Sequence, residues 1–354
     1  MTSRRAFLAS LIATAGLPAL GWADVGSPAY LAAAKQDGGF VLHGLSVSGT
    51  SLFRIALPAR GHAACAHPVR PEAVAFARRP GIFALVIDCV GGQVIAHLTP
   101  PDGRQFNGHG AFTHAGDLLM TSEVVADTSE GRIGLWDGRD YTRIGEWSSG
   151  GIGPHDMKRL SDGRLVIANG GIQTDPTDRS KLTLATMHPN LTLLSPQGVL
   201  LEQVDLGDAL AQNSIRHLAL SPGGTVAFAM QWEGDPAEPV PQLGLWTPGT
   251  PPRLCPPDDA QALVMQGYAG SIAFSGNGAH VAITSPKGGA VMIFAADGTP
   301  VATHRRADLC GIAPGPKDFV LTDGLGALWD CGTDRFELLR TAAAAWDNHL
   351  IALI

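Results

Sequence analysis

HGAFTHAGDLLMTSE (109–123), HDMKRLSDGRLVIAN (155–169), HLALSPGGTVAFAMQ (217–231) and SIAFSGNGAHVAITS (271–285) follow one pattern in this sequence. Each stretch begins and ends with a polar residue and reads as an apolar strand, a Gly-containing turn and a second apolar strand, which is a β-hairpin. Antiparallel pairing places the first and last residues of such a hairpin side by side. We therefore expect the polar pairs to mark one level of one face in a β-propeller with a polar, histidine-bearing mouth.

A second repeated feature is an ending in which alternating apolar residues lead to Trp or a substitute and then to a polar turn with Gly. It occurs as GLWDG (134–138), GLWTPG (244–249), MIFAADG (292–298) and ALWDCG (327–332), with looser versions in GGQVIAHLTPPDG (91–103) and LTLLSPQG (191–198). We expect this ending on the third strand of a blade, where the turn releases the chain into the outermost strand. The two patterns place repeats near 72–107, 108–151, 152–211, 212–266, 267–308 and 309–343.

The two ends of the chain complement each other. Residues 30–58 supply three strand patterns, and the apolar WDNHLIALI near 345–353 supplies a fourth. Together they predict a seventh blade that closes the ring and leaves no long exposed sheet edge. The sequence thus predicts an all-β, seven-bladed propeller, WD40/YVTN-like, with blade 1 built from N- and C-terminal strands and with residues 24–354 as a single domain.

The N-terminal segment has the features of an export signal. SRRAFL (3–8) matches the twin-arginine pattern, and small residues place a cleavage site after Ala23. The apolar stretch is too short for the roughly 20 residues of a comfortable membrane span. We therefore expect cleavage of residues 1–23, a periplasmic location and no stable membrane anchor.

Charge and cysteine content narrow the function classes. Without residues 1–23, which hold Arg4 and Arg5 but no acid, 23 basic residues face 32 acidic ones, a formal charge of −9. Nucleic acid is therefore not expected as a partner, and we expect a monomer. The five Cys form no C-x-x-C motif. A Cys310–Cys331 bridge and five small buried thiols are both compatible with the sequence.

Several segments resemble the bacterial domain-of-unknown-function 1513 family (DUF1513). The similar stretches are GHGAF (108–112), GIGPHDM (151–157), LVIANGGIQT (165–174), SIRHLAL (214–220), FAMQWEGD (228–235), GSIAFS (270–275) and TSPKGG (284–289). The resemblance implies a seven-bladed propeller. It also implies a setting in iron uptake, beside imelysin-type and di-haem oxidoreductase-like periplasmic proteins as possible partners.

The candidate site follows from the repeated hairpins. His109, His155 and His217 hold equivalent positions on three consecutive blades, so their imidazoles should point toward one volume near the mouth. Imidazole with carboxylate suits a divalent ion such as iron, copper or zinc. The remaining candidate ligand-binding residues are Glu123, Asn169, Gln231, Glu233, Arg216, Asp156, Ser271, Ser285 and Lys287.

These residues permit more than one function. We favour a periplasmic binding protein, an accessory in iron or metal acquisition, whose mouth binds a metal or a metal-bearing ligand. The same histidines could instead bond neighbouring loops and fix blade against blade, as in a non-catalytic protein-protein interaction scaffold. A lactonase-like or other small-molecule enzyme is the third alternative, although no nucleophile-elbow, zincin, P-loop or Rossmann motif is present. The other histidines, His62 and His349 included, are expected to be ordinary turn or strand residues.

Overall fold

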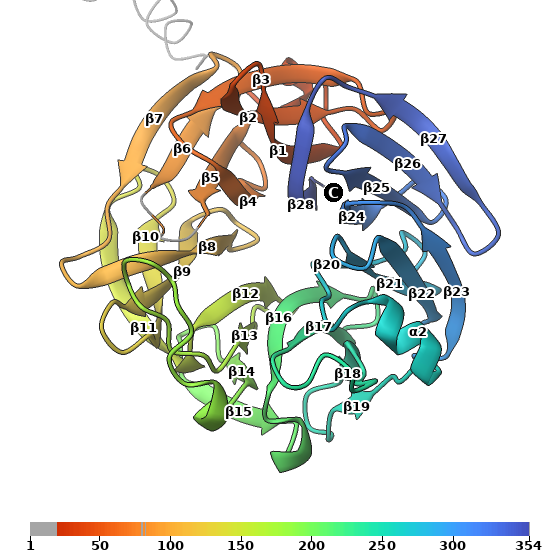
Figure 1. Ribbon diagram of the computed structural model, residues 1–354. Coiled ribbons are helices and arrows are strands. Elements are labelled where there is room, and N and C mark those ends of the chain that lie inside the picture. The colour runs from red at the N-terminus through yellow and green to blue at the C-terminus, as the bar shows by residue number, and fades with distance from the viewer. Residues whose placement is uncertain (1–19, 79–80, 82, 354) are drawn as a thin grey trace, which may run out of the picture.

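The computed structural model describes residues 20–78, 81 and 83–353. Their strands form seven four-stranded antiparallel sheets, which stand as blades around a central axis (Figure 1). The predicted seven-bladed β-propeller is confirmed. Residues 1–19 of the predicted leader, with Arg4 and Arg5, lie outside the described part of the chain.

Each blade has one strand next to the axis and three that follow outward. Blade 1 contains β28 (Ala345–Ala352), β1 (Tyr30–Gln36), β2 (Gly39–Leu45) and β3 (Ser51–Leu57). Blade 2 contains β4 (Gly61–Ala66), β5 (Glu72–Ala77), β6 (Ala84–Asp88) and β7 (Gln93–Leu98). Blade 3 contains β8 (Arg104–Phe112), β9 (Leu118–Val125), β10 (Glu130–Asp137) and β11 (Arg143–Ile152). Blade 4 contains β12 (Pro154–Arg159), β13 (Leu165–Asn169), β14 (Asn190–Leu194) and β15 (Leu200–Asp205).

The other three blades follow the same order. Blade 5 contains β16 (Asn213–Leu220), β17 (Val226–Trp232), β18 (Leu243–Trp246) and β19 (Arg253–Leu254). Blade 6 contains β20 (Ser271–Phe274), β21 (His280–Ser285), β22 (Ala290–Ala295) and β23 (Pro300–Arg305). Blade 7 contains β24 (Leu309–Pro314), β25 (Phe319–Asp323), β26 (Ala327–Cys331) and β27 (Phe336–Thr341).

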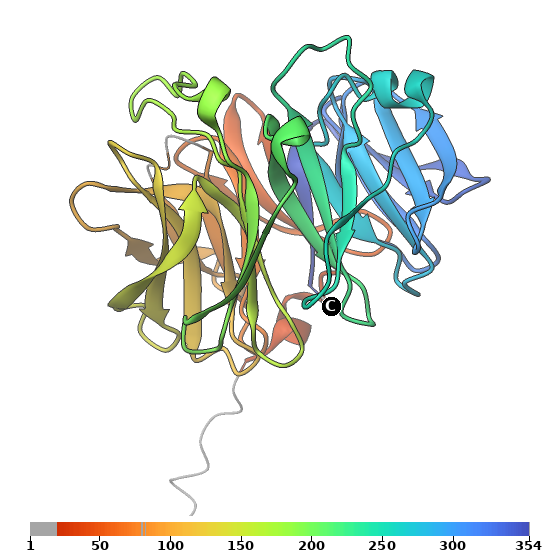
Figure 2. The same cartoon turned by 90° about the horizontal axis from the view of Figure 1, so that it is seen from below.

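Helical turns in the described residues are short. They are η1 (Trp22–Val25), η2 (Leu184–Thr186), η3 (Asp208–Leu210) and α2 (Asp259–Val264). No helix in the part of the chain described above is long and apolar enough to cross a membrane. Figure 2 shows the loop around residues 170–188 and α2 on one side of the ring, and the C-terminus on the other.

Blade 1 closes the ring as predicted. The C-terminal strand β28 pairs with β1, from Tyr30 opposite Ala352 to Lys35 opposite Ala345. Trp346 and Leu350 of β28 are buried in a hydrophobic cluster that also holds residues of blade 7. Seven such clusters occur among the described residues, each between two neighbouring blades. Burial of apolar surface between blades therefore holds the ring together.

One expectation about the blades is wrong, and of the two cysteine arrangements that the sequence left open, the structure has the one with buried thiols. The segment 91–103 does not hold a third strand: β6 is the third strand of blade 2, and β7 within that segment is the outermost one. Blade 2 therefore begins at Gly61 rather than near residue 72. The sequence misplaced this boundary because β6 ends in a turn that lacks the Trp-containing ending. No Cys310–Cys331 bridge forms, since all five cysteines of the described chain are free and buried.

Candidate functional site: a histidine cluster at the axis

The innermost strands carry β-bulges where they approach the axis. The register of the first hairpin shifts between Gly61 and Ala64 in blade 2, and between Pro154 and Asp156 in blade 4. Corresponding shifts occur in β8, β16, β24 and in the pairing of β28 with β1. A bulge bends its strand and re-aims the side chains beside it. Four histidines of four different blades lie within these bulges, namely His62, His109, His155 and His349, and His217 of a fifth blade directly follows the bulge at Arg216.

These five residues form what we call the histidine cluster. Their ring centroids lie 4.6 to 6.0 Å apart in eight pairs, and all five side chains are buried. In blade 7 the innermost strand carries Gly311 instead. A Cβ at that position would lie 2.9 Å from the backbone nitrogen of Leu350, so glycine lets β28 pack closely there.

The geometry of the cluster suits a metal ion. The nitrogens of His62, His109 and His349 lie within 4.8 Å of one another, as do those of His109, His155 and His217. Nitrogens that share one tetrahedral zinc ion lie about 3.3 Å apart, given Zn–N bonds of about 2.0–2.1 Å. The nitrogens of a triad would have to approach one another by up to about 1.5 Å to share one ion. His109 belongs to both triads.

Each ring of the histidine cluster also has a buried nitrogen without a hydrogen-bond partner among the described residues. They are Nδ1 of His62, His155 and His217, and Nε2 of His109 and His349. A buried polar atom without a partner costs about 1–3 kcal/mol. Five such atoms on five rings that lie against one another favour a site that a ligand completes.

Burial keeps most of the cluster neutral. It lowers the pKa of His62, His155 and His349 well below the ordinary value, and the neighbouring histidines lower it further. The same two causes lower the pKa of His217 to about 3. Neutral imidazole is the form that binds metals, so a metal ion would displace few protons here.

Asp156 supports the cluster from one side. Its Oδ1 lies 3.3 Å from Nδ1 of His109, and its Oδ2 accepts a hydrogen bond from the backbone N–H of Leu218 at 2.9 Å. Burial alone would raise the pKa of this carboxyl, but Lys158 and His109 hold it well below its usual range. A carboxylate on one imidazole nitrogen orients the other nitrogen toward a metal and makes it more basic. His109 thus has the arrangement expected of a metal ligand.

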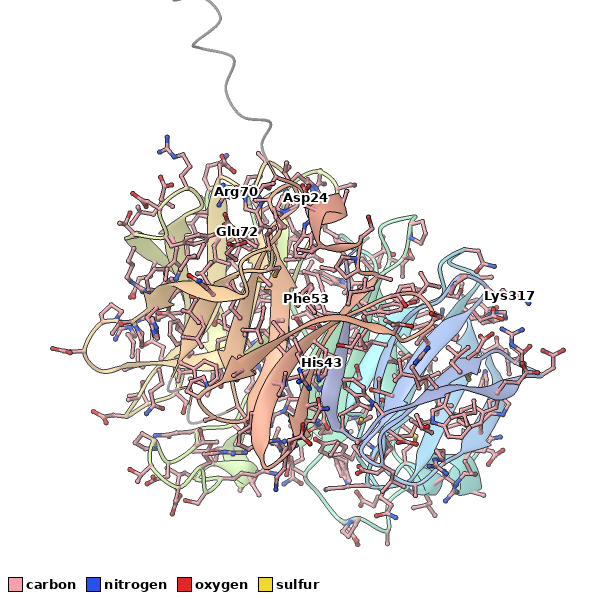
Figure 3. All side chains as sticks on the ribbon, turned by 90° about the horizontal axis from the view of Figure 1, so that it is seen from above. Asp24, His43, Phe53, Arg70, Glu72 and Lys317 are labelled. Carbon is pink, nitrogen blue, oxygen red and sulfur yellow. The ribbon has the colours of Figure 1, made fainter. Side chains whose placement is uncertain are left out.

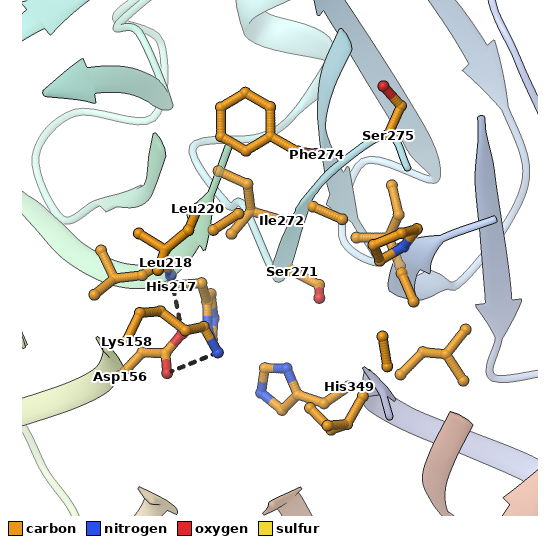
Figure 4. A pocket seen from close by; sticks show the side chains of 18 of the residues that line it. Asp156, Lys158, His217, Leu218, Leu220, Ser271, Ile272, Phe274, Ser275 and His349 are labelled. Carbon is orange, nitrogen blue, oxygen red and sulfur yellow. Dashed lines mark hydrogen bonds and ion pairs between the residues drawn. The ribbon is translucent and has the colours of Figure 1, made fainter. Parts of the chain in front are cut away.

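A cavity of about 600 Å³ leads to the histidine cluster. His109, His217 and His349 line its inner end together with Asp156 and Lys158 (Figure 4). From there it follows the innermost strands to the turns after them, such as Ser221–Pro222 and Ser275–Gly276. The C-terminal residues of β28 line the same end, so this is the face opposite the loop around residues 170–188.

Three residues predicted beside the histidines lie elsewhere. Glu123 is fully buried within blade 3, where Arg143 donates to it at 2.7 Å; burial raises the pKa of its carboxyl. Asn169 bonds Asn190 and Thr192 within blade 4 and Ser149 of the neighbouring blade 3. Gln231 donates to the backbone oxygen of Ala269 at 3.1 Å. All three therefore serve the blades rather than the cluster.

The remaining candidates divide between the cavity and the loop face. Ser271 lines the cavity. Glu233 pairs with Lys181 of the 170–188 loop at 2.5 Å. Ser285 donates to the backbone oxygen of Met265, and Lys287 lies over the ring of Tyr268, 4.9 Å from its centroid. Arg216 is buried, which lowers the pKa of its guanidinium, and it lies near His155.

Sequence reasoning missed His62 and His349. Fourteen residues after His62 stands the apolar Phe76, and no hairpin follows His349 because β28 pairs with β1. Alignment of the innermost strands would have found both: GHAAC (61–65), GHGAF (108–112), PHDMK (154–158), RHLAL (216–220) and NHLIA (348–352) all have His in the second position.

A buried histidine outside the cluster shows the contrast. His43 lies on β2 of blade 1 (Figure 3), where its Nδ1 bonds the hydroxyl of Ser51 at 2.9 Å and its ring packs edge-on against Trp346. Burial and Arg54 lower its pKa to about 4. Nε2 of His43 also has no hydrogen-bond partner among the described residues, but His43 belongs to neither group of converging histidines in that part of the chain, and this isolation distinguishes it from the histidine cluster.

Comparison with other proteins supports the fold and identifies the family. A chain of Kuenenia stuttgartiensis hydrazine synthase is similar over 87% of this chain and 91% of its own, with 14% identity and a TM-score of 0.59. A chain of the mitotic checkpoint complex is similar over 78% and 75%, with 10% identity and a TM-score of 0.55. Such low identities show the fold alone. No curated protein matches the sequence. Residues 55–353 match the family described as "Protein of unknown function (DUF1513)", and the chain belongs to this family.

Proposed function

We propose that this propeller binds a divalent transition-metal ion in the histidine cluster. The observation that carries the proposal is the convergence of five buried imidazoles, each with an unpaired nitrogen among the described residues. The position of Asp156 behind His109 supports it, because that pairing is typical of metal-bound histidine.

The donor set narrows the choice of ion. Imidazole nitrogen suits zinc, copper and iron, whereas calcium and magnesium prefer oxygen ligands. The five cysteines are buried in the hydrophobic clusters, where burial raises the pKa of the Cys89 and Cys310 thiols to about 12 and also raises the pKa of the Cys65 thiol. The site is thus a nitrogen site with one supporting carboxylate.

The wider role that we propose is in iron or metal acquisition in the periplasm. The twin-arginine pattern SRRAFL (3–8) supports export. The resemblance to proteins found beside imelysin-type and di-haem oxidoreductase-like proteins supports a place in iron uptake. In this role the protein would hold an ion, or a metal-bearing ligand, at the axis of the propeller.

The test is the metal content of purified residues 24–354 after exposure to zinc, copper or iron and removal of loosely bound ions. We expect about one ion or more per wild-type chain. His109→Ala should weaken binding more than His155→Ala does, because His109 serves both triads. Asp156→Asn should weaken it by about 10–100-fold.

His97 provides a matched control, because it is exposed on the outermost strand β7. His97→Ala should keep the wild-type metal content. A wild-type protein that retains none of the three metals would refute the proposal, as would an equal loss of metal in His97→Ala and His109→Ala. Circular dichroism spectra of all variants would show whether a loss of metal reflects a loss of fold.

A further inference from the structure

Resting on the proposed metal site, we infer that the 600 Å³ cavity binds an organic anion with an apolar body, whose anionic group reaches the metal. The cavity shares His109, His217 and His349 with the histidine cluster. A molecule in it would therefore meet the metal directly. Its volume is that of a typical small-molecule site.

The charges at the inner end of the cavity favour an anionic ligand once a metal ion is bound. Among the residues that line the cavity, Asp156 is the sole acid and Lys158 the sole base, and their charged groups lie 3.4 Å apart. These two charges offset each other. A divalent ion on these ligands would keep its two positive charges beside an apolar wall. An unpaired charge in such surroundings is costly, so an anionic ligand would stabilise the loaded site.

The walls of the cavity favour a ligand whose remaining part is apolar. Beyond the polar inner end the lining is mainly aliphatic and aromatic, with Leu218, Leu220, Ile272, Phe274, Ile312 and Leu350. Figure 4 shows the first four of these side by side, with Asp156, Lys158, His217 and His349 further in. A ligand with a charged group at one end and a hydrocarbon at the other matches both parts. Lys158, partly exposed at the inner end, is placed to pair with the charged group.

Octanoate and its neutral isostere octanamide test the inference on zinc-loaded protein, by isothermal titration calorimetry with zinc content measured in the same samples. Octanoate should bind at least about tenfold more tightly than octanamide, because only the carboxylate compensates the metal charge. Lys158→Gln should weaken octanoate about tenfold. Lys35→Gln should have no effect, since Lys35 pairs with Ala345 at the far end of β28 from the cavity mouth.

A second pair of variants distinguishes the effect of a negative charge in the cavity wall from the effect of a changed side-chain shape. Leu220 is half-buried in the cavity wall. Leu220→Glu should weaken octanoate at least about tenfold through like-charge repulsion, whereas Leu220→Gln should weaken it much less, both with zinc content unchanged. Zinc-loaded protein that binds neither compound, or both equally, would overturn the inference and leave the metal site intact. Protein without bound zinc would refute the proposed function itself.

Discussion

In metal-free protein the histidine cluster should take about 5 kcal/mol from the unfolding free energy between about pH 7.5 and about pH 5.5. The pKa values of His62, His155, His217 and His349 are lowered in the folded chain by burial and by one another. In the unfolded chain they return to about 6.5. Below that pH the unfolded chain binds protons that the folded chain does not, so stability is present above about pH 6.5 and is lost as the pH falls.

Each of the four residues should contribute on the order of 1 kcal/mol to this loss at one pH unit below the unfolded pKa. Asp156 favours protonated histidine in the cluster, while Lys158 and Arg216 oppose it. The measurement is urea unfolding at several pH values with a chelator present. His155→Asn combined with His349→Asn should remove about half of the loss that the cluster causes, and His97→Ala should leave the loss unchanged. If the double variant lost as much unfolding free energy as the wild type, the cluster histidines would not be the cause of the pH dependence.

Removal of residues 345–354 should abolish cooperative folding. This deletion takes away β28, which pairs with β1 along blade 1 and buries Trp346 and Leu350 against blades 7 and 1. It exposes the edge of β1, whose residues 30–34 are buried. Loss of buried aromatic and leucine side chains costs about 2–5 kcal/mol for each residue, which together exceeds the stability of many domains. Near-UV circular dichroism and thermal unfolding would show the loss.

A circular permutant distinguishes the effect of losing β28 from the effect of moving the chain ends. The backbone N–H of Leu353 bonds the carbonyl of Ala29, so a short linker can join the two ends of the described chain. New termini fit in the exposed turn at 235–239 between β17 and β18. The permutant keeps every strand and should unfold cooperatively. A truncated protein with the melting temperature of the wild type would show that β28 does not hold the ring closed.

The fold was predictable because its signals are local and repeated. The apolar alternation and the turns with Gly recur around the ring, and several blades add a Trp-containing ending, as in GLWDG (134–138) on β10. The complementary leftover strands at 30–58 and 345–353 predicted how the ring closes. The boundary of blade 2 was missed because its third strand lacks the repeated ending.

The site was only partly predictable, because β-bulges change the register. Equal spacing placed Glu123 opposite His109, but the pairing residue of Glu123 is Phe106. Likewise Gln231 pairs with Ser214 rather than with His217. A shift of one residue sends a side chain to the other face of its sheet. Sequence spacing therefore found three histidines of the cluster but attached the wrong neighbours to them.

The central claim is that the histidine cluster holds a metal ion, and X-ray absorption spectroscopy of zinc-loaded protein tests it most directly. The account predicts at least three nitrogen ligands at about 2.0–2.1 Å, with the outer-ring scattering of imidazole, and a loss of this signal in His109→Ala. Zinc with only oxygen ligands in the wild type, or with the same nitrogen shell in the wild type and in a variant with all five cluster histidines replaced, would contradict it.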